Sequence, residues 1–229
     1  MALNFTTTKK ASLNHGVKCL VYGEAGVGKT MLCGTCPGPL IISAEQGLLT
    51  LRNKDVPAIV VSSYAEVLEA FEWCRTTAAS KGIQTVCLDS ISEIAEKCLV
   101  TEKAKTKDPR AAYGEMATSV IDLVKKFRDL PGFHVLVTAK QTLSEDSVSG
   151  VVKAVPTAPG RQVAEQLPYL FDEVFHAYAG KDPATQVPFY ALRTRASFNA
   201  VAKDRSGSLD EIEYPDISNI IGKIQKPRT

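Results

Sequence analysis

A glycine-rich octapeptide near the start of the chain places the strongest constraint on its fold. Residues 23–30 read Gly-Glu-Ala-Gly-Val-Gly-Lys-Thr, after an apolar run and before a helix-forming stretch. In such a loop glycines let the backbone N–H groups surround a phosphate, while the lysine and threonine reach the terminal phosphates and a magnesium ion. The pattern is a P-loop and predicts a bound nucleoside triphosphate with Mg²⁺; the alternative is a glycine-rich turn with a chance lysine. The residues expected to contact the nucleotide are Gly23, Glu24, Ala25, Gly26, Val27, Gly28, Lys29, Thr30 and Met31.

Composition and charge exclude several classes of protein. The 229 residues are 45% hydrophobic and 23% charged, with a formal net charge of +2, as in an ordinary globular domain. So small a net charge means that any nucleic acid must be bound by a local cluster of Lys and Arg. No apolar run approaches the ~20 residues of a membrane span, and the first residues lack the apolar region of a signal peptide. We expect no membrane partner and a location in the cytoplasm, here that of a bacterial host.

Six cysteines are scattered at 19, 33, 36, 74, 87 and 98, a usage that fits a reducing compartment. Cys33 and Cys36 form a C-x-x-C motif, but a zinc site needs about four ligands, and neither a second pair nor a nearby histidine supplies them. We therefore expect these cysteines to be small buried hydrophobic residues, with metal or redox use as the alternative.

Short apolar runs alternate with helical patterns through the first two thirds of the chain. Apolar residues recur at helical spacing in 64–74 and 91–98. Each pattern begins with a capping box, Ser63 with Glu66 in the first and Ser90 with Glu93 in the second. Strand, crossover helix and strand in series predict an α/β fold with a mostly parallel sheet. The predicted strands are 17–22, 40–43, 58–61, 85–88 and 133–138.

The last third changes character, because short turns replace the crossover helices. We expect strands at 173–179, 187–197 and 199–203, which add antiparallel strands to the sheet. A short closing helix starts at 215 within a C-terminal helix and tail at 215–229. The prediction is one domain spanning 1–229, preceded by an N-terminal arm at 1–14.

Two polar segments, 101–112 and 142–160, resist assignment to a helix or a strand. Structureless loops approaching ~20 residues are uncommon in a compact domain and are usually functional. Cations on such loops can follow a phosphate backbone, although a charged run is alternatively just a solvated face. The second segment has no aromatic residue on which bases would stack. The candidate DNA contacts are Lys103, Lys105, Lys107 and Arg110 in the first segment and Lys153 in the second.

Two carboxylates follow predicted strands of the parallel sheet. Asp89 ends the run 86–88, where P-loop enzymes hold magnesium, and Glu45 follows the run 40–43. The carboxyl ends of parallel strands meet at one rim, so both residues are expected beside the P-loop, with Thr30 and Asp89 on the metal and Glu45 positioning the attacking water. Alternatively, Asp89 starts the next helix and Glu45 is a surface residue.

Three segments resemble the ATPase core of RecA. Residues 40–48, Leu-Ile-Ile-Ser-Ala-Glu-Gln-Gly-Leu, are similar to the strand that ends in its catalytic glutamate. Residues 86–90, Val-Cys-Leu-Asp-Ser, resemble its magnesium strand rather than the Asp-Glu form of AAA+ and helicase ATPases. Residues 137–141, Val-Thr-Ala-Lys-Gln, are similar to the strand whose terminal polar residue senses the γ-phosphate and leads into a DNA-binding loop. The resemblance implies a RecA-like P-loop fold, ATP and Mg²⁺ as cofactors, and catalytic roles for Lys29, Glu45 and Gln141.

A fourth segment, Val-Ala-Lys-Asp-Arg at 201–205, resembles the Lys-x-Lys or Lys-x-Arg fingers that RecA and DnaB-type proteins insert into a neighbouring subunit's active site. It implies that Lys203 and Arg205 act catalytically in a neighbour, so that hydrolysis requires assembly. The alternative is a charged hairpin tip. At the other end of the chain, Phe-Thr-Thr-Thr at 5–8 resembles the segment by which eukaryotic-type recombinases dock onto a neighbour, with an ordinary terminal arm as the alternative.

The resemblance covers 17–205 and only the ATPase core, a plan similar to the phage-encoded, core-only single-strand annealing ATPases. It implies single-stranded DNA, further copies of this chain and a single-strand-binding protein as partners, in phage recombination. Two other functions stay open: an AAA+ or helicase-loader-like ATPase, and a nucleotide-gated DNA-binding scaffold with little hydrolysis. The preference for adenine or guanine is also left open.

Overall fold

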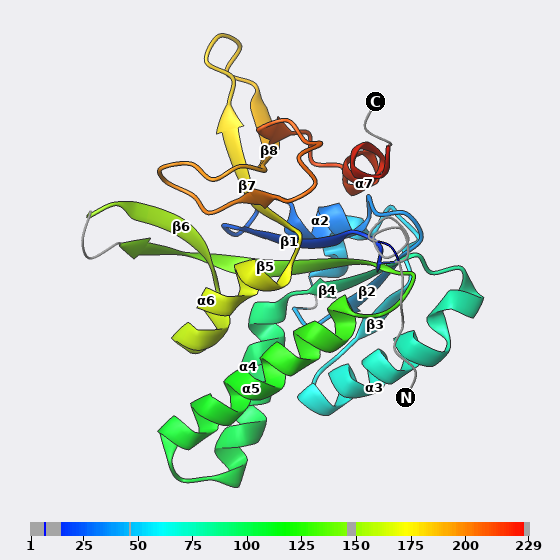
Figure 1. Cartoon of the computed structure of the whole chain (residues 1–229), viewed down its shortest axis with the longest axis vertical. Helices are drawn as coiled ribbons and strands as arrows, with labels where there is room; N and C mark the ends of the chain where they lie inside the picture. Colours follow the sequence, from blue (N-terminus) through cyan, green and yellow to red (C-terminus); the bar gives the residue numbers. More distant parts are fainter. Residues whose placement is uncertain (1–6, 8–14, 46, 146–149, 227–229) are drawn as a thin grey trace.

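A ten-stranded sheet with helices on both faces organises the chain in the computed structural model, which describes residues 7, 15–45, 47–145 and 150–226 (Figure 1). The strand order is β10-β8-β7-β1-β5-β4-β2-β3, with β6 added beside β5 and β9 beside β7. The strands are β1 (Lys18–Gly23), β2 (Pro39–Ser43), β3 (Ala58–Val60), β4 (Thr85–Asp89), β5 (His134–Glu145), β6 (Val152–Thr157), β7 (Glu173–Lys181), β8 (Pro188–Arg193), β9 (Lys203–Asp204) and β10 (Ile212–Glu213).

The sheet has a parallel centre and an antiparallel extension. β3, β2, β4, β5, β1 and β7 run parallel, whereas β8 and β10 continue beyond β7 in antiparallel pairing. The central strands are buried on both faces, and their near-continuous apolar runs are what a covered parallel sheet requires. The predicted α/β class, with a mostly parallel sheet and antiparallel C-terminal strands, is confirmed.

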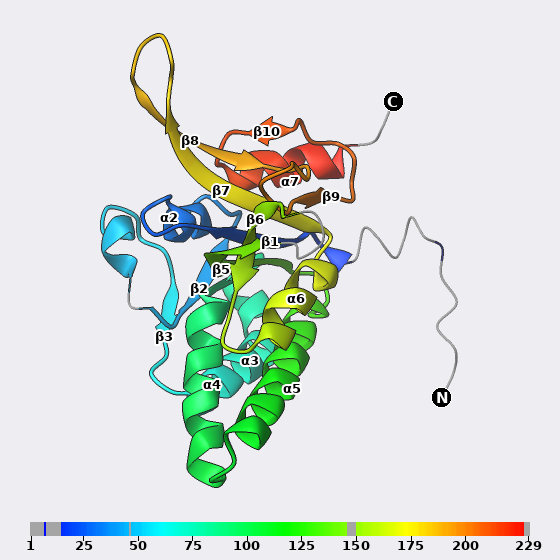
Figure 2. The same cartoon turned by 90° about the vertical axis from the view of Figure 1, so that its left-hand side faces the viewer.

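Helices cover both faces of the sheet (Figure 2), and a hydrophobic layer lies between the helices and the sheet on each face. The larger lies under four helices, and the smaller lies under α2 and α7. Five of the six cysteines are less than 3% exposed and Cys36 is 7% exposed, so these thiols pack as small apolar groups. The helices are α2 (Lys29–Cys33), α3 (Tyr64–Thr76), α4 (Ile91–Lys105), α5 (Pro109–Arg128), α6 (Arg161–Leu170) and α7 (Ile217–Gln225), with short 3₁₀ turns η1 (Leu48–Leu51) and η2 (Ala78–Lys81).

Side-chain caps begin α3, α4 and α7 at the positions that the sequence predicts. The Ser63 hydroxyl accepts a hydrogen bond from the Glu66 N–H at the start of α3. The Ser90 hydroxyl accepts from the Glu93 N–H at the start of α4. The closing helix α7 begins after Asp216, which caps its first turn. Each cap satisfies a backbone donor that the helix leaves unpaired.

The segment 101–112 is a helical hairpin rather than the expected loop. α4 continues to Lys105, and α5 starts at Pro109 with Asp108 as its N-cap, so the two helices project together from the sheet (Figures 1 and 2). Glu102 is buried and its carboxylate binds Lys105, while Ala112 is buried against the core. The prediction was wrong because Lys and Thr were taken as loop composition, although Asp-Pro is a usual helix start.

The segment 142–160 is likewise ordered over most of its described length. β5 extends to Glu145, and β6 returns beside it in antiparallel register from Lys140↔Thr157 to Glu145↔Val152. Residues 146–149 of this segment lie outside the described residues. The prediction of a loop was wrong because β-branched residues on both sides of the turn form a hairpin longer than the core strands.

The C-terminal strands differ from prediction in length. β8 ends at Arg193 rather than 197, and in place of the strand at 199–203 there is one bridge, between Ala154 and Ala200, followed by the two-residue β9. Residues 187–191 form part of a hairpin that projects away from α4 and α5 (Figure 2).

The N-terminal arm, apart from Thr7, and residues 227–229 of the tail lie outside the described residues. Within the described ranges, no helix is both long enough and apolar enough to cross a bilayer.

Candidate functional site

The P-loop joins β1 to α2 at the carboxyl rim of the sheet. Gly26 and Gly28 have φ angles of 82° and 90°, a left-handed conformation that glycine adopts at little cost. The loop therefore curls rather than continuing as strand or helix, and it forms one wall of a cavity of about 930 Å³. That volume suits a ligand the size of a nucleoside triphosphate.

Lys29 lies at the mouth of this loop. Its Nζ donates to the carbonyl oxygens of Gly23 (2.9 Å) and Glu24 (2.7 Å). Burial lowers the pKa of Lys29, while the negative charges of Glu45 and Asp89 act in the opposite direction. A phosphate would replace two neutral acceptors by charged oxygens, which form stronger hydrogen bonds with an ammonium group.

Thr30 and Asp89 meet as the sequence predicts. The Thr30 hydroxyl donates to Asp89 Oδ2 at 2.7 Å, and Asp89 is only 1% exposed. The Thr138 hydroxyl, from β5, donates to the other carboxylate oxygen at 2.6 Å. Hydroxyl and carboxylate oxygens are the ligands that Mg²⁺ prefers, usually with several waters retained. These residues therefore fit a magnesium ion, which when bound would neutralise charge on the phosphates.

Glu45 lies at the end of β2, at the same rim and lining the same cavity. The Ser90 hydroxyl donates to Glu45 Oε1, so the residue after Asp89 orients this carboxylate. The residue after Glu45 lies outside the described part of the chain. An exposed carboxylate that faces the phosphate cavity is a suitable group to position a water molecule.

Gln141 lines the far side of the cavity, where its amide is fixed by a histidine. Gln141 Oε1 lies 2.9 Å from His176 Nε2 and, as a carbonyl oxygen, accepts the hydrogen bond. His176 stacks on Tyr22 and Tyr178, with ring centroids 5.2 and 5.8 Å apart. Burial first, and then the positive charge of Arg193, lower the pKa of His176 and favour its neutral form. The stack holds Gln141 at the edge of the P-loop.

Lys203 and Arg205 are not brought to this rim within one chain. β9 pairs with the first residues of β7, at the amino edge of the parallel strands, and Glu173 of β7 lies beside Cys19 of β1. The P-loop begins at Gly23, roughly 13 Å farther along β1 at 3.3 Å per residue. Lys203 Nζ donates to the Pro168 carbonyl at 2.7 Å, and Arg205 forms an ion pair of 2.9 Å with Asp172.

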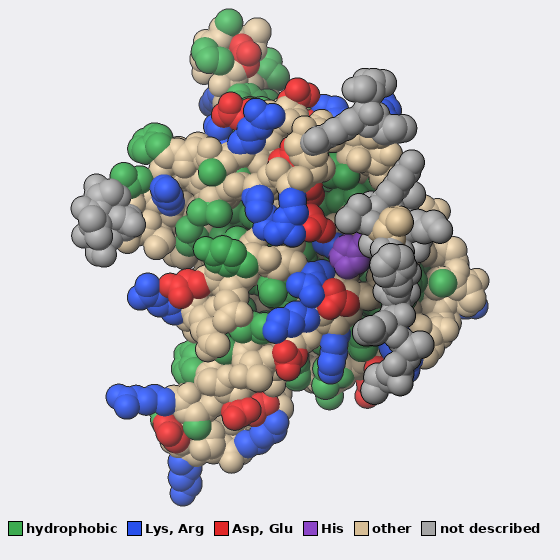
Figure 3. Space-filling model, in the orientation of Figure 1, with side chains coloured by type: hydrophobic (Ala, Val, Ile, Leu, Met, Phe, Trp, Pro, Cys, Tyr) green, Lys and Arg blue, Asp and Glu red, His purple; other side chains and the backbone are tan. Residues whose placement is uncertain are grey.

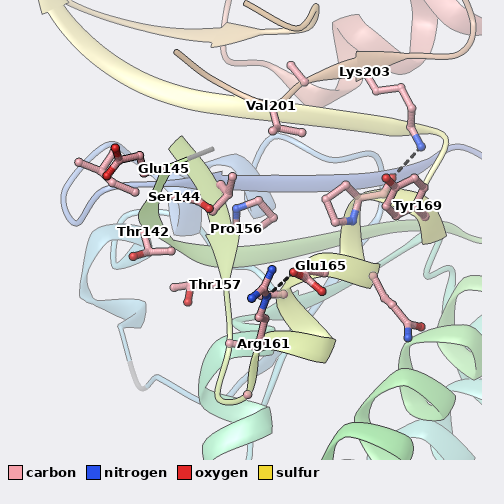
Figure 4. Close-up of a pocket in the computed structure, with 18 residues that line it drawn as sticks. Thr142, Ser144, Glu145, Pro156, Thr157, Arg161, Glu165, Tyr169, Val201 and Lys203 are labelled. Atoms are coloured by element: carbon pink, nitrogen blue, oxygen red, sulfur yellow. Dashed lines mark hydrogen bonds and ion pairs between the residues drawn. The ribbon is translucent and has the colours of Figure 1, made fainter. Parts of the chain in front are cut away.

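A second cavity, of about 1090 Å³, lies between the β5–β6 hairpin, α6 and β9 (Figure 4). Ser144 and Glu145 stand at one end of it, and Tyr169 and Lys203 stand at the other (Figure 4). Tyr169 is 82% exposed, so the aromatic side chain missing from 142–160 is supplied to the same groove by α6. This aromatic contribution was missed at the level of sequence, because α6 itself was not predicted.

The candidate DNA cations lie on the two projecting hairpins. Lys and Arg side chains, with acidic ones among them, cover the tip of the α4–α5 hairpin in Figure 3. Lys103 lies over the Tyr113 ring, 5.4 Å from its centroid, and Lys105 binds Glu102. Lys107 is exposed between the two helices, Arg110 is exposed in the first turn of α5, and Lys153 is half-buried on β6.

Sequence reasoning missed Thr138, His176 and Lys140, which the sheet register brings to the rim. Thr138 and Lys140 belong to the run 137–141, whose period of two places both on the P-loop face. A polar residue inside an apolar strand was the available signal for Thr138. His176 had no such signal, because its contact with Gln141 depends on the β1–β7 pairing.

One known family matches most of the chain. The family model described as an AAA domain matches residues 15–206, which include the P-loop, Asp89, Gln141 and β9. Comparison with curated proteins gave no match. Among solved structures, the chain is similar to a KaiC-like protein of the hyperthermophilic archaeon Pyrococcus horikoshii OT3, with a TM-score of 0.41 and 12% identity over 78% of this chain and 79% of that one. The chain therefore belongs to the AAA domain family and is a P-loop ATPase with an α/β fold built on a mostly parallel sheet.

Proposed function

We propose that this ATPase binds and anneals single-stranded DNA in phage homologous recombination, and hydrolyses ATP with Mg²⁺ at interfaces between subunits. Lys29 and Thr30 bind the phosphates and the metal, Asp89 holds the metal, Glu45 positions water and Gln141 senses the γ-phosphate. Lys203 and Arg205 complete the site of a neighbouring copy. A single-strand-binding protein is the further partner that this role implies.

One observation carries the proposal: both cation-bearing hairpins continue directly from strands that form the nucleotide site. β4 ends at Asp89 and leads at once into α4, and β5 passes through Gln141 into the β5–β6 hairpin. Ser92 joins the bases of the two hairpins, because its hydroxyl accepts from the Lys140 N–H (2.9 Å) and donates to the Thr157 carbonyl (2.6 Å). A change at the γ-phosphate would therefore reach both hairpins through a few bonds.

The arrangement of polar groups around the groove of Figure 4 also suits a single strand. The exposed Tyr169 ring offers a stacking surface for a base at one end of the groove. Arg161 lines the groove too, although its ion pair with Glu165 offsets part of its charge. Backbone contacts would then come from the α4–α5 tip, whose four cations are exposed.

ATPase activity measured with and without single-stranded DNA tests the proposal. Stimulation by DNA is expected. The family's AAA domain description favours a second candidate, a helicase-loader-like motor, for which turnover would be independent of DNA. No turnover in either condition would instead favour a nucleotide-gated scaffold.

Removing the four cations of the α4–α5 tip gives a sharper test. If they contact ~4 phosphates, a plot of the logarithm of the DNA-binding constant against the logarithm of salt concentration should have a slope of about −3. Most of that slope should be lost in the variant that replaces all four by alanine, namely Lys103, Lys105, Lys107 and Arg110→Ala. The matched control replaces Lys125 and Lys126, exposed on the same α5 helix. Equal slopes in the two variants would contradict a DNA contact at the tip.

A further inference from the structure

The side chain of Lys140 is a cation at the nucleotide cavity and has no role in the proposal above, which uses only the Lys140 backbone N–H. It lies in β5 directly opposite Gly23 of β1, in the residue pair where the P-loop begins. Alternate residues of β5 face the P-loop helix: Leu136 packs in the layer under α2, and Thr138 binds Asp89. Because strand side chains alternate between faces, Lys140 is next in this series, and it lines the cavity together with Lys29 and Glu45.

The backbone of Lys140 is fixed, but its side chain is only loosely held. Its N–H is anchored to the Ser92 hydroxyl at 2.9 Å. Its ammonium group forms an ion pair with Glu93 in the first turn of α4, and the Lys140 side chain in that pair is 49% exposed. Exposed ion pairs contribute little free energy, so a stronger anion in the cavity would compete successfully for this ammonium group.

Lys140 and Lys29 line the same nucleotide cavity, and their charges act on each other. Burial is the main reason that the pKa of Lys29 is lowered, and the positive charge of Lys140 contributes in the same direction. Glu93 is the main reason that the pKa of Lys140 is raised, and Glu45 contributes through its charge. Two lysines and one carboxylate thus share a cavity that would hold a triphosphate, whose charge would attract both ammonium groups.

We propose that Lys140 is a second, same-chain cation for the γ-phosphate, released from Glu93 when ATP binds. The inference rests on the nucleotide site of the proposed function and adds a catalytic residue to it. In hydrolysis, the water oxygen bonds to the γ-phosphorus while the bond to the β,γ-bridging oxygen breaks, and its electron pair stays on ADP. The water proton goes to Glu45. Lys140 keeps its proton and stabilises the charge on the γ-phosphoryl oxygens.

The test compares the affinities of ADP and of a non-hydrolysable ATP analogue with a γ-phosphate, with Mg²⁺ and without DNA. Lys140→Ala should weaken binding of the analogue about tenfold, as expected for loss of a charged hydrogen bond, while ADP binding changes less than about twofold. Glu93→Gln frees the lysine and should tighten binding of the analogue but not of ADP. Lys140→Arg should retain most of the discrimination.

Under the proposal, Lys140→Ala weakens binding of the ATP analogue and Glu93→Gln strengthens it. If the Lys140–Glu93 pair only braces β5 against α4, both variants will change ADP and analogue binding alike, and that result would overturn the inference, as would unchanged discrimination in Lys140→Ala. Lys126→Ala, an exposed lysine of α5, is the control. Loss of DNA annealing or of assembly would not alter these affinities, so the inference fails separately from the proposed function.

Discussion

The carboxyl rim and the β9 edge of this chain both carry charged groups, but they use them differently. At the rim, Lys29, Glu45 and Lys140 open onto a cavity that fits a nucleotide. At β9, Lys203 and Arg205 are bound to a carbonyl and a carboxylate of their own chain, at the opposite edge of the parallel strands. The rim therefore has phosphate-binding and metal-binding groups within one chain, whereas the β9 cations lie away from their own rim, and under the proposal they act at the rim of a neighbouring copy.

The largest effect is expected at the rim from Lys29→Ala. Losing the cation that reaches the terminal phosphates should reduce hydrolysis about 10³-fold or more. Steady-state phosphate release measures it, with thermal unfolding to confirm that the variant is folded. Substantial turnover in this variant would show that hydrolysis occurs elsewhere than at the P-loop.

Asp89→Asn should lower hydrolysis about 10²- to 10³-fold by weakening the magnesium site. The amide retains the size of the carboxylate and still accepts from Thr30 or Thr138, so the fold should persist. A magnesium titration of ATPase activity checks this prediction, because the variant should require more Mg²⁺. An unshifted magnesium dependence would remove Asp89 from the metal site.

Substitution of the β9 cations should lower hydrolysis while leaving nucleotide binding intact, unlike substitution of Lys29 at the rim. Lys203→Ala and Arg205→Ala should each lower hydrolysis at least about 100-fold without weakening nucleotide binding, since their own rim is intact. Turnover and binding of a fluorescent ATP analogue are measured on the same samples. Normal turnover would refute the assignment as fingers and leave two charged residues that bind β9 and the residue after it to α6 and to the turn before β7.

The smallest effect concerns the stability of the β9 edge. Glu173 is 1% exposed, its Oε2 has no hydrogen-bond partner among the described residues, and burial together with the nearby Asp204 raises its pKa to about 8. Between about pH 4.5 and 8 the folded state holds this proton and the unfolded chain does not, so stability falls as pH rises through that window. The decline stops above about pH 8.

Glu173→Gln should remove this decline and flatten the dependence of stability on pH. The difference in unfolding free energy between the variant and the wild type should grow with pH, by at most about 1.4 kcal/mol for each pH unit. Urea unfolding at pH 5, 6, 7 and 8 measures it, with the exposed Glu165→Gln as control. Parallel curves would mean that Glu173 is already ionised.

The sequence predicted the features that depend on local patterns, and it failed at two hairpins and at contacts between strands. The P-loop motif, the apolar strands and the capping residues Ser63 and Ser90 act locally, so they predicted the α/β class and the position of Asp89 beside Thr30. The hairpins at 101–112 and 142–160 were missed because their polar composition was interpreted as loop, although the Asp108-Pro109 helix start and the β-branched residues beside the β5–β6 turn were local signals for ordered structure. Register between strands decides which side chains share the rim, so Lys140 and His176 became visible only in the structure.

Mixing two inactive variants tests the central claim, that one chain's rim is completed by another chain's β9. Lys29→Ala provides intact β9 cations, and the double variant Lys203→Ala, Arg205→Ala provides an intact rim. Mixed assemblies should regain ATPase activity, because about one interface in four then combines both intact halves. Activity that stays at the sum of the two separate variants, in samples shown by light scattering to form mixed assemblies, would contradict a site shared between subunits.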